Sequence, residues 1–354
     1  MRHSVALQPR EARRSLFVDV GNLTGATVMG EAAAQDAEDF SRLEHLPVTF
    51  FAVLMGLFGL ALALHAAAGS FAWAEAPARV AVWLGLAGFA AIGAVYVAKA
   101  MRYPRAVVAE WHHPVKLAFF PTITISLLLM ATAIHGYRPD LAEPVWLIGV
   151  AGQGVLTVAV ISGWISHRAF EVGHLTPAWF IPAVGNVIVP LAGAQMGWIE
   201  ISWLFFSAGM VFWLILLVLV FNRLIFHAPI PSRLFPTLVI LIAPPAVAFA
   251  SYTRLAGGVD AFGHILLNSA YVFAALVLVQ VPKLMKLPFA LSWWALSFPL
   301  AALSVASFVY GRAAESGAHV VIGLVVLGLL AAVVAGLLWR TGLAIARGEI
   351  CRPE

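Results

Sequence analysis

The chain has 354 residues, of which 62% are hydrophobic and only 11% are charged, against roughly 25% charged residues in a typical soluble domain. This composition excludes an ordinary soluble protein and indicates an integral membrane protein. The formal net charge of +4 comes from Lys and Arg residues that lie mostly in the tails and in the loops between apolar segments. We therefore expect membrane lipid as a partner and no nucleic acid.

Residues 1–45 are predicted to form a cytoplasmic N-terminal tail. They end in an acidic stretch that contains Asp36, Glu38 and Asp39. No apolar stretch typical of a signal peptide precedes a cleavage site. The sequence leaves open whether this tail is disordered, forms a short amphipathic helix or acts as a regulatory element.

Ten apolar segments follow, each long enough to be read as a membrane helix, for which at least about 18 apolar residues are needed. They predict an all-α integral membrane protein with a membrane domain at 46–343 and a cytoplasmic C-terminal tail at 344–354. The segments are 46–67, 78–99, 115–135, 144–166, 177–196, 199–221, 236–253, 262–281, 289–310 and 318–340.

The distribution of Lys and Arg predicts the orientation. If both termini are cytoplasmic, 17 of the 21 Lys and Arg residues lie in cytoplasmic tails and loops, as the positive-inside rule requires. The outside connections then hold four residues only, namely Arg79, Arg138, Arg254 and Arg312.

Prolines interrupt every second segment. Pro121, Pro182, Pro244 and Pro299 are spaced by 61, 62 and 55 residues. A proline inside a helix removes a backbone hydrogen bond and bends the helix, and in lipid the freed carbonyl must be satisfied by protein or a water-filled cavity. The pattern predicts five helical hairpins, in which kinked odd-numbered helices form an inner ring around a pore. The alternative is that these prolines are merely tolerated.

Polar residues in the predicted inner helices are mild ones, and they are candidates for lining the pore: Thr122, Thr124, Ser126, Asn186, Ser251, Ser297 and Ser304. The alternative for each hydroxyl is a hydrogen bond back to its own helix or to a neighbour. The buried amide of Asn186 needs partners in either case.

Charged residues are missing from the interior of the segments. The absence of Asp and Glu there argues against a cation pathway or an acidic proton relay. No membrane-embedded Lys or Arg is expected either. Lys116 is the candidate cation at the cytoplasmic mouth, with Lys99 nearby; alternatively, these residues only fix the topology.

The number and positions of the cysteine and histidine residues favour neither a metal site nor an enzyme. Cys351 is the only cysteine, and the 11 histidines fall at segment ends and in tails or loops, so no ligand set for a metal or haem is completed. We expect no cofactor and no catalytic residues. The histidines can still confer pH sensitivity.

Five stretches resemble, in the same order, the tellurite-resistance/dicarboxylate transporter family, which includes the plant guard-cell slow anion channels. The resemblance covers residues 46 to 343. The stretches are Glu110-Trp111-His112-His113-Pro114-Val115-Lys116 with Phe119 and Pro121, Phe180-Ile181-Pro182-Ala183-Val184, Leu204-Phe205-Phe206-Ser207-Ala208-Gly209-Met210, Ala243-Pro244 with Ser251-Tyr252, and Trp293-Trp294-Ala295-Leu296-Ser297-Phe298-Pro299.

The resemblance implies five hairpins around a central pore, a homotrimer with one pore per subunit, a bacterial inner membrane and the permeation of anions. It also implies that a phenylalanine in the ninth segment, Phe298 here, plugs the pore. The family often has a proline in the first segment where this chain has Leu54, which puts the local pore shape in doubt.

The residues around Phe298 fit a gate, because Pro299 follows it directly and Ala301 and Ala302 leave room for a ring to move. A hydrophobic constriction blocks ions by excluding water. We therefore expect a gated anion channel for small monovalent anions such as chloride and nitrate. The alternative is a secondary transporter or exporter of dicarboxylate, sulfite or tellurite-related anions.

Overall fold

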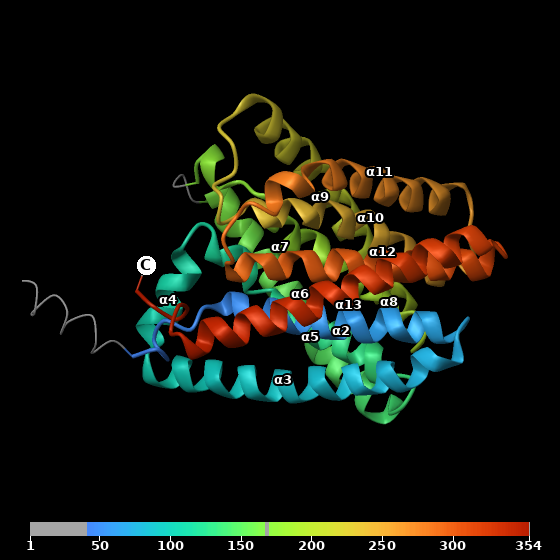
Figure 1. Cartoon of the computed structure of the whole chain (residues 1–354), viewed down its shortest axis with the longest axis horizontal. Helices are drawn as coiled ribbons and strands as arrows, with labels where there is room; N and C mark the ends of the chain where they lie inside the picture. Colours follow the sequence, from blue (N-terminus) through green and yellow to red (C-terminus); the bar gives the residue numbers. More distant parts are fainter. Residues whose placement is uncertain (1–40, 167–169, 354) are drawn as a thin grey trace, which may run out of the picture. The chain divides into compact units, whose positions relative to one another are not determined.

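The computed structural model describes residues 41–166 and 170–353, and the helices form one compact unit from Arg42 to Arg352. The predicted N-terminal tail, 1–45, lies almost entirely outside the described residues. The α-helices (Figure 1) are α2 (Phe51–Ala68), α3 (Glu75–Arg102), α4 (Pro104–His112), α5 (Thr122–Ile134), α6 (Pro139–Ser166), α7 (Phe180–Val184), α8 (Pro190–Gly193), α9 (Ile199–Phe226), α10 (Ala243–Ala256), α11 (Ala261–Leu284), α12 (Ser297–Ala313) and α13 (Gly317–Ala346).

Nine helical segments within the described residues are long and apolar enough to cross a membrane. Nine of the ten predicted segments correspond to them, so the prediction of an all-helical membrane protein is confirmed. The remaining segment, predicted at 177–196, is helical over Pro177–Gly193 in four short pieces. The proline at position 190 begins the last of these pieces, because a proline fits best in the first turn of a helix.

Burial separates the spans into two groups. In the spans that contain α2, α5, α10 and α12, between 56% and 94% of the most apolar window is buried. In the spans of α3, α6, α9, α11 and α13 the buried share is only 22% to 33%. A helix that is apolar all round and exposed on one side suits a lipid-facing position. The odd-numbered spans are therefore the inner ones.

Contacts between the inner spans close a ring. α2 contacts α5, α5 contacts α8, α8 contacts α10, α10 contacts α12, and α12 returns to α2. Each outer helix packs against the inner span that precedes it in the chain, as α3 does on α2 and α13 does on α12. In Figure 1, α12 and α13 run side by side along the horizontal axis.

Each inner span begins with a 3-10 segment. These segments also contact one another in a closed ring, which we call the 3-10 collar. The collar consists of Val48–Phe50, Lys116–Phe119, Pro177–Trp179, Phe235–Ile242 and Leu291–Leu296.

The four prolines lie where each 3-10 segment passes into an α-helix. Pro121 directly precedes α5, Pro244 is the second residue of α10, and Pro182 and Pro299 are the third residues of α7 and α12. Backbone amides in the first turn of an α-helix have no α-helical partner, so a proline there removes no α-helical hydrogen bond. The prolines thus mark a change of helix type instead of interrupting an α-helix midway.

Candidate functional site

A cavity of about 30 Å³ lies among the five inner spans. Since a water molecule needs roughly 10–15 Å³ of such space, the cavity has room for about two. Every span of the ring contributes to its wall, and all lining residues are apolar: Gly59, Leu62, Leu129, Leu191, Val247, Ala250, Phe298, Ala301, Ala302 and Val305. A space of this size and lining holds water poorly.

Phe298 is part of the wall of this cavity. It is half-buried and is the second residue of α12, directly after the collar segment Leu291–Leu296. A Cβ at Gly59 of α2 would lie 3.5 Å from Cδ2 of Phe298. The same Cβ would lie 2.9 Å from Cβ of Ala301, so the missing side chain at position 59 lets α2 approach α12 closely beside the ring.

None of the seven polar residues predicted to line the pore is among the cavity-lining residues. All seven are buried. The carbonyl groups that accept their hydrogen bonds are Phe119 for Thr122, Pro121 for Thr124, Thr122 for Ser126, Ala183 for Asn186, Val187 for Ser251, Trp294 for Ser297 and Gly323 for Ser304. In this structure they join helices to one another or bond back to their own helix.

The broken fifth span is held by two polar residues of the outer helix α6 that sequence analysis did not single out. Thr157 donates to the carbonyl of Pro182 at 2.8 Å and to Oδ1 of Asn186 at 3.1 Å. Gln153 donates to the same Pro182 carbonyl at 3.3 Å and accepts from Thr124 at 2.7 Å. These bonds satisfy polar groups that would otherwise be costly in a membrane interior.

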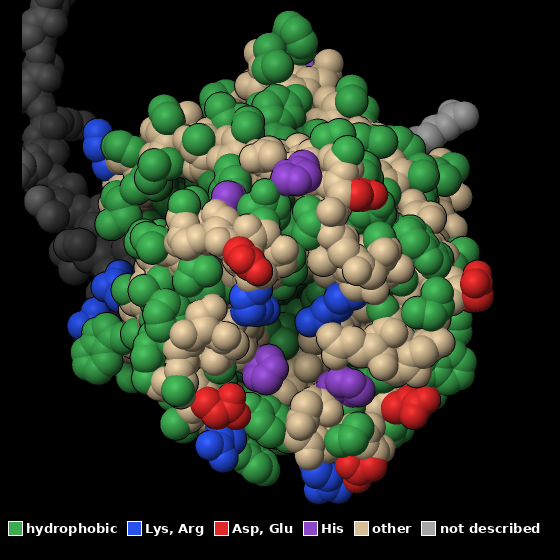
Figure 2. All heavy atoms as spheres, turned by 90° about the vertical axis from the view of Figure 1, so that its right-hand side faces the viewer, with side chains coloured by type: hydrophobic (Ala, Val, Ile, Leu, Met, Phe, Trp, Pro, Cys, Tyr) green, Lys and Arg blue, Asp and Glu red, His purple; other side chains and the backbone are tan. Residues whose placement is uncertain are grey.

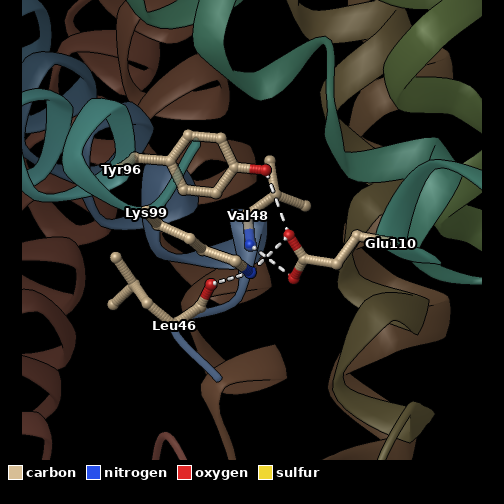
Figure 3. A network of polar contacts seen from close by, with 5 residues as sticks. All are labelled: Leu46, Val48, Tyr96, Lys99 and Glu110. Carbon is tan, nitrogen blue, oxygen red and sulfur yellow. Dashed lines mark hydrogen bonds and ion pairs between the residues drawn. The ribbon is translucent and has the colours of Figure 1, made fainter. Parts of the chain in front are cut away.

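Lys99, which the sequence places near the predicted cytoplasmic mouth, is a buried and paired cation. It is 1% exposed, and its Nζ lies 2.9 Å from Oε2 of Glu110. Nζ also donates to the carbonyl of Leu46, while Glu110 accepts from the hydroxyl of Tyr96 and the amide of Val48 (Figure 3). A buried Lys is tolerated because it has a partner; this pair ties the start of the first inner span to α3 and α4.

Lys116, the predicted cation at the mouth, is half-buried and begins the second segment of the 3-10 collar. It belongs to the same end of the molecule as Lys99 and Glu110, because the collar segments Val48–Phe50 and Lys116–Phe119 contact each other.

The opposite end of the ring carries a second group of cations. Arg254 lies in the last turn of α10 and Arg312 in the last turn of α12. Nη1 of Arg312 donates to the carbonyl of Ala66 near the end of α2, at 2.5 Å. Figure 2 shows this face, with Lys or Arg side chains on both sides of a central hollow and histidines around it. From the sequence alone, both arginines are expected only as parts of outside connections.

The described residues contain no group of three or more His, Cys, Asp or Glu side chains placed to hold a metal ion. The apolar cavity forms a narrow dry section of the ring, and Arg254 and Arg312 end two of the helices that line it.

Comparison with known proteins gives a consistent result. The family described as voltage-dependent anion channel (SLAC1) matches residues 45–342. The S-type anion channel SLAH2 of Arabidopsis thaliana is 28% identical over 264 residues, which cover 73% of this chain and 50% of the plant protein. The tellurite resistance protein TehA homolog of Haemophilus influenzae is 27% identical over 293 residues, covering 80% of this chain and 89% of the relative.

An uncharacterized transporter of Methanocaldococcus jannaschii is 26% identical over 240 residues, which cover 58% of this chain and 67% of the relative. The match thus spans only about half of the plant channel but most of the bacterial relative. The family match at 45–342 takes in all inner spans and nearly all of the outer ones.

Proposed function

The chain belongs to the voltage-dependent anion channel (SLAC1) family, and from this membership we propose that it is a gated channel that passes small monovalent anions such as chloride and nitrate through its central ring. The observation that carries the proposal is the apolar cavity to which all five inner spans contribute and in whose wall Phe298 lies. Membership of the family indicates an anion channel or transporter. The small apolar cavity supports a pore that is closed at Phe298.

Phe298 is proposed as the gate. An ion that enters a dry cavity of about 30 Å³ must give up most of its hydration shell, and this cost closes the path without any charged barrier. Replacing Phe298 by Ala removes the ring from the wall that it shares with Ala301 and Ala302 and so enlarges the cavity. The enlarged space admits water, and hydrated ions can then cross.

The test is to record currents across bilayers that contain the purified wild-type protein or Phe298→Ala, under an asymmetric chloride gradient. We expect a small current from the wild type and a much larger one from the variant, reversing near the chloride equilibrium potential. Phe226→Ala is the matched control, because Phe226 is 74% exposed on the outer helix α9. Its current should equal that of the wild type.

Other outcomes have definite meanings. Equal currents from the wild type and Phe298→Ala keep the channel but remove Phe298 as its plug. No current from either folded protein contradicts a channel and favours a secondary transporter or exporter of dicarboxylate, sulfite or tellurite-related anions. Uptake of such an anion into vesicles, saturable and driven by a gradient, would then establish the carrier.

We further propose that the chain works as a homotrimer in a bacterial inner membrane with both termini cytoplasmic. The Lys and Arg distribution supports the orientation. The face of α13 that carries Gly328, Ala332 and Gly336 is exposed in the single chain, and small residues at this spacing suit close helix contacts. Mass measurement of the detergent-solubilised protein tests the number of subunits.

A further inference from the structure

Four arginines lie at the end of the molecule opposite the 3-10 collar, and they fall into two kinds. Arg79 pairs with Glu75 at 3.9 Å, and Arg138 pairs with Asp140 at 2.7 Å. Among the described residues, Arg254 and Arg312 have no acidic partner. Arg312 has Glu315 three positions away in the chain but, in the part of the chain that the structure describes, forms no ion pair with it. The position of these two cations therefore needs an explanation other than a surface ion pair.

Both arginines continue the cavity-lining faces of their helices. Arg254 follows the cavity residue Ala250 by four positions on α10, and Arg312 follows the cavity residue Val305 by seven positions on α12. Residues four or seven apart lie on the same face of an α-helix. The two cations therefore lie beyond the dry cavity on the faces that line it.

The two side chains are held in place. Nη1 of Arg312 is bound to the carbonyl of Ala66, and a Cβ at Gly69 would lie 3.0 Å from this nitrogen. The amide oxygen of Gln195, once its amide group is turned to face the guanidinium, lies 2.9 to 3.2 Å from the nitrogens of Arg254. Within the described residues Arg312 donates one hydrogen bond, to Ala66. Since a guanidinium carries five N–H donors, others are left for a ligand.

The two guanidinium groups also act on each other. α10 and α12 pack against each other, and both arginines lie in the last turns of these helices, so their like charges repel. An anion between them removes this repulsion and gains from both charges. The planar guanidinium fork matches an oxyanion with two parallel hydrogen bonds, whereas a halide is a single point of charge.

We propose that Arg254 and Arg312 form a binding site for small planar oxyanions, of the carboxylate or nitrate type, at the mouth of the central cavity. The proposal rests on the proposed function, because it names the anion class that this path selects. The site concentrates the anion beside the dry section and gives oxyanions an advantage over chloride.

The experiment uses the full chain carrying Phe298→Ala in planar bilayers, with nitrate on one side and chloride on the other. The variants are R254Q, R312Q, the double variant, and R254K and R312K, which keep the charge but lose the fork. R138Q is the matched control, since it removes a cation of the same end that is already paired with Asp140. Thermal unfolding in detergent checks that each variant is folded.

We expect the double Gln variant to lose about tenfold in nitrate conductance at low salt, because a charged mouth raises the local anion concentration by at least this order. The loss should shrink at high salt as the charges are screened. The two Lys variants should keep the chloride conductance and lose the preference for nitrate. R138Q should match the background.

An unchanged nitrate conductance in the folded double Gln variant overturns the site. Lys variants with the full nitrate preference overturn the assignment to planar oxyanions, because charge alone would then suffice. If the Phe298→Ala background itself passes no anion, the proposed function fails, and this result is distinct from either of the others.

Discussion

Gly59 of α2 lies against Phe298 of α12: a Cβ built on Gly59 would stand 3.5 Å from Cδ2 of Phe298 and 2.9 Å from Cβ of Ala301. Both residues are part of the cavity wall. The absence of a side chain at position 59 is therefore what lets α2 and α12 approach beside the ring.

A larger residue at position 59 should block the path that the loss of the Phe298 ring opens. In the Phe298→Ala background we expect Gly59→Val to remove most of the anion current, because its methyl groups enter the space that the ring leaves. The measurement is the chloride current across a bilayer. Gly93→Val on α3, where a Cβ meets nothing within 4 Å, serves as the control; an equally large loss there would show a general effect.

A polar side chain in the cavity wall should increase the anion current even when Phe298 is unchanged, because it helps the cavity to hold water. Val247 lines the cavity and is 4% exposed, and Val247→Thr keeps its shape while adding a hydroxyl. One hydrogen bond to water is worth about 1 kcal/mol, so we expect roughly a fivefold larger anion current than in the wild type. Val325→Thr, on the exposed face of α13, should change nothing. An unchanged current in Val247→Thr would contradict exclusion of water as the barrier.

The buried pair of Lys99 and Glu110 should be costly to break from one side. Lys99→Met leaves a buried carboxylate without its cation, a change that costs about 3–5 kcal/mol of the free energy of unfolding. Adding Glu110→Gln should recover much of this loss, since the charge is gone, the amide oxygen can still accept from the amide of Val48, and the amide NH2 can donate to the hydroxyl of Tyr96. Denaturant unfolding in detergent measures both. Arg102→Met, at an exposed site, should stay within about 0.5 kcal/mol of the wild type.

Asp260 should make stability depend on acid pH. Its side chain accepts from the hydroxyl of Tyr252 at 2.5 Å and from the amide of Gly263 at 2.9 Å, where it caps α11. The Tyr252 hydroxyl is the main cause that holds the pKa of Asp260 below its ordinary 3.8. Because the folded pKa is the lower one, the stabilisation is present above pH 3.8 and disappears as the pH falls through the folded value.

Asp260→Asn keeps an acceptor for the cap but does not titrate. We expect the thermal midpoint of this variant to fall less steeply than that of the wild type when the pH is lowered below 3.8. Parallel curves for the wild type and Asp260→Asn would mean that this cap does not contribute to the acid sensitivity.

The apolar segments and their division into inner and outer spans could be predicted because lipid imposes length and composition on each helix separately. The 3-10 collar could not be predicted, since it depends on contacts between five segments far apart in the chain. The spacing of the prolines correctly identified the inner spans. It predicted a bend inside each helix, however, where the structure has a junction between a 3-10 segment and an α-helix. The roles of Phe298 and of the predicted pore-lining residues stay predictions.

Some roles of the charged residues could be predicted from the sequence, and others could not. Lys99 and Glu110 come from different helices, and nothing in their spacing indicates a buried pair. The signal for Arg254 and Arg312 was present: Arg79 and Arg138 have an acidic residue four or two positions away in the chain. Arg254 has no acidic residue that near, and Arg312 has Glu315 three positions away; each of the two arginines ends an inner span.

The closure of the inner ring by α12 on α2 bears on how the protein is made. The bond from Arg312 to Ala66 joins residues 246 positions apart. During synthesis the earlier spans enter the membrane while one wall of the future conduit is still missing. Until the ninth span is inserted, the faces that will pack against it are in contact with lipid or with the insertion machinery. Contacts between distant parts of a chain form last. A chain cut short before residue 291 should insert in the membrane yet enclose no passage.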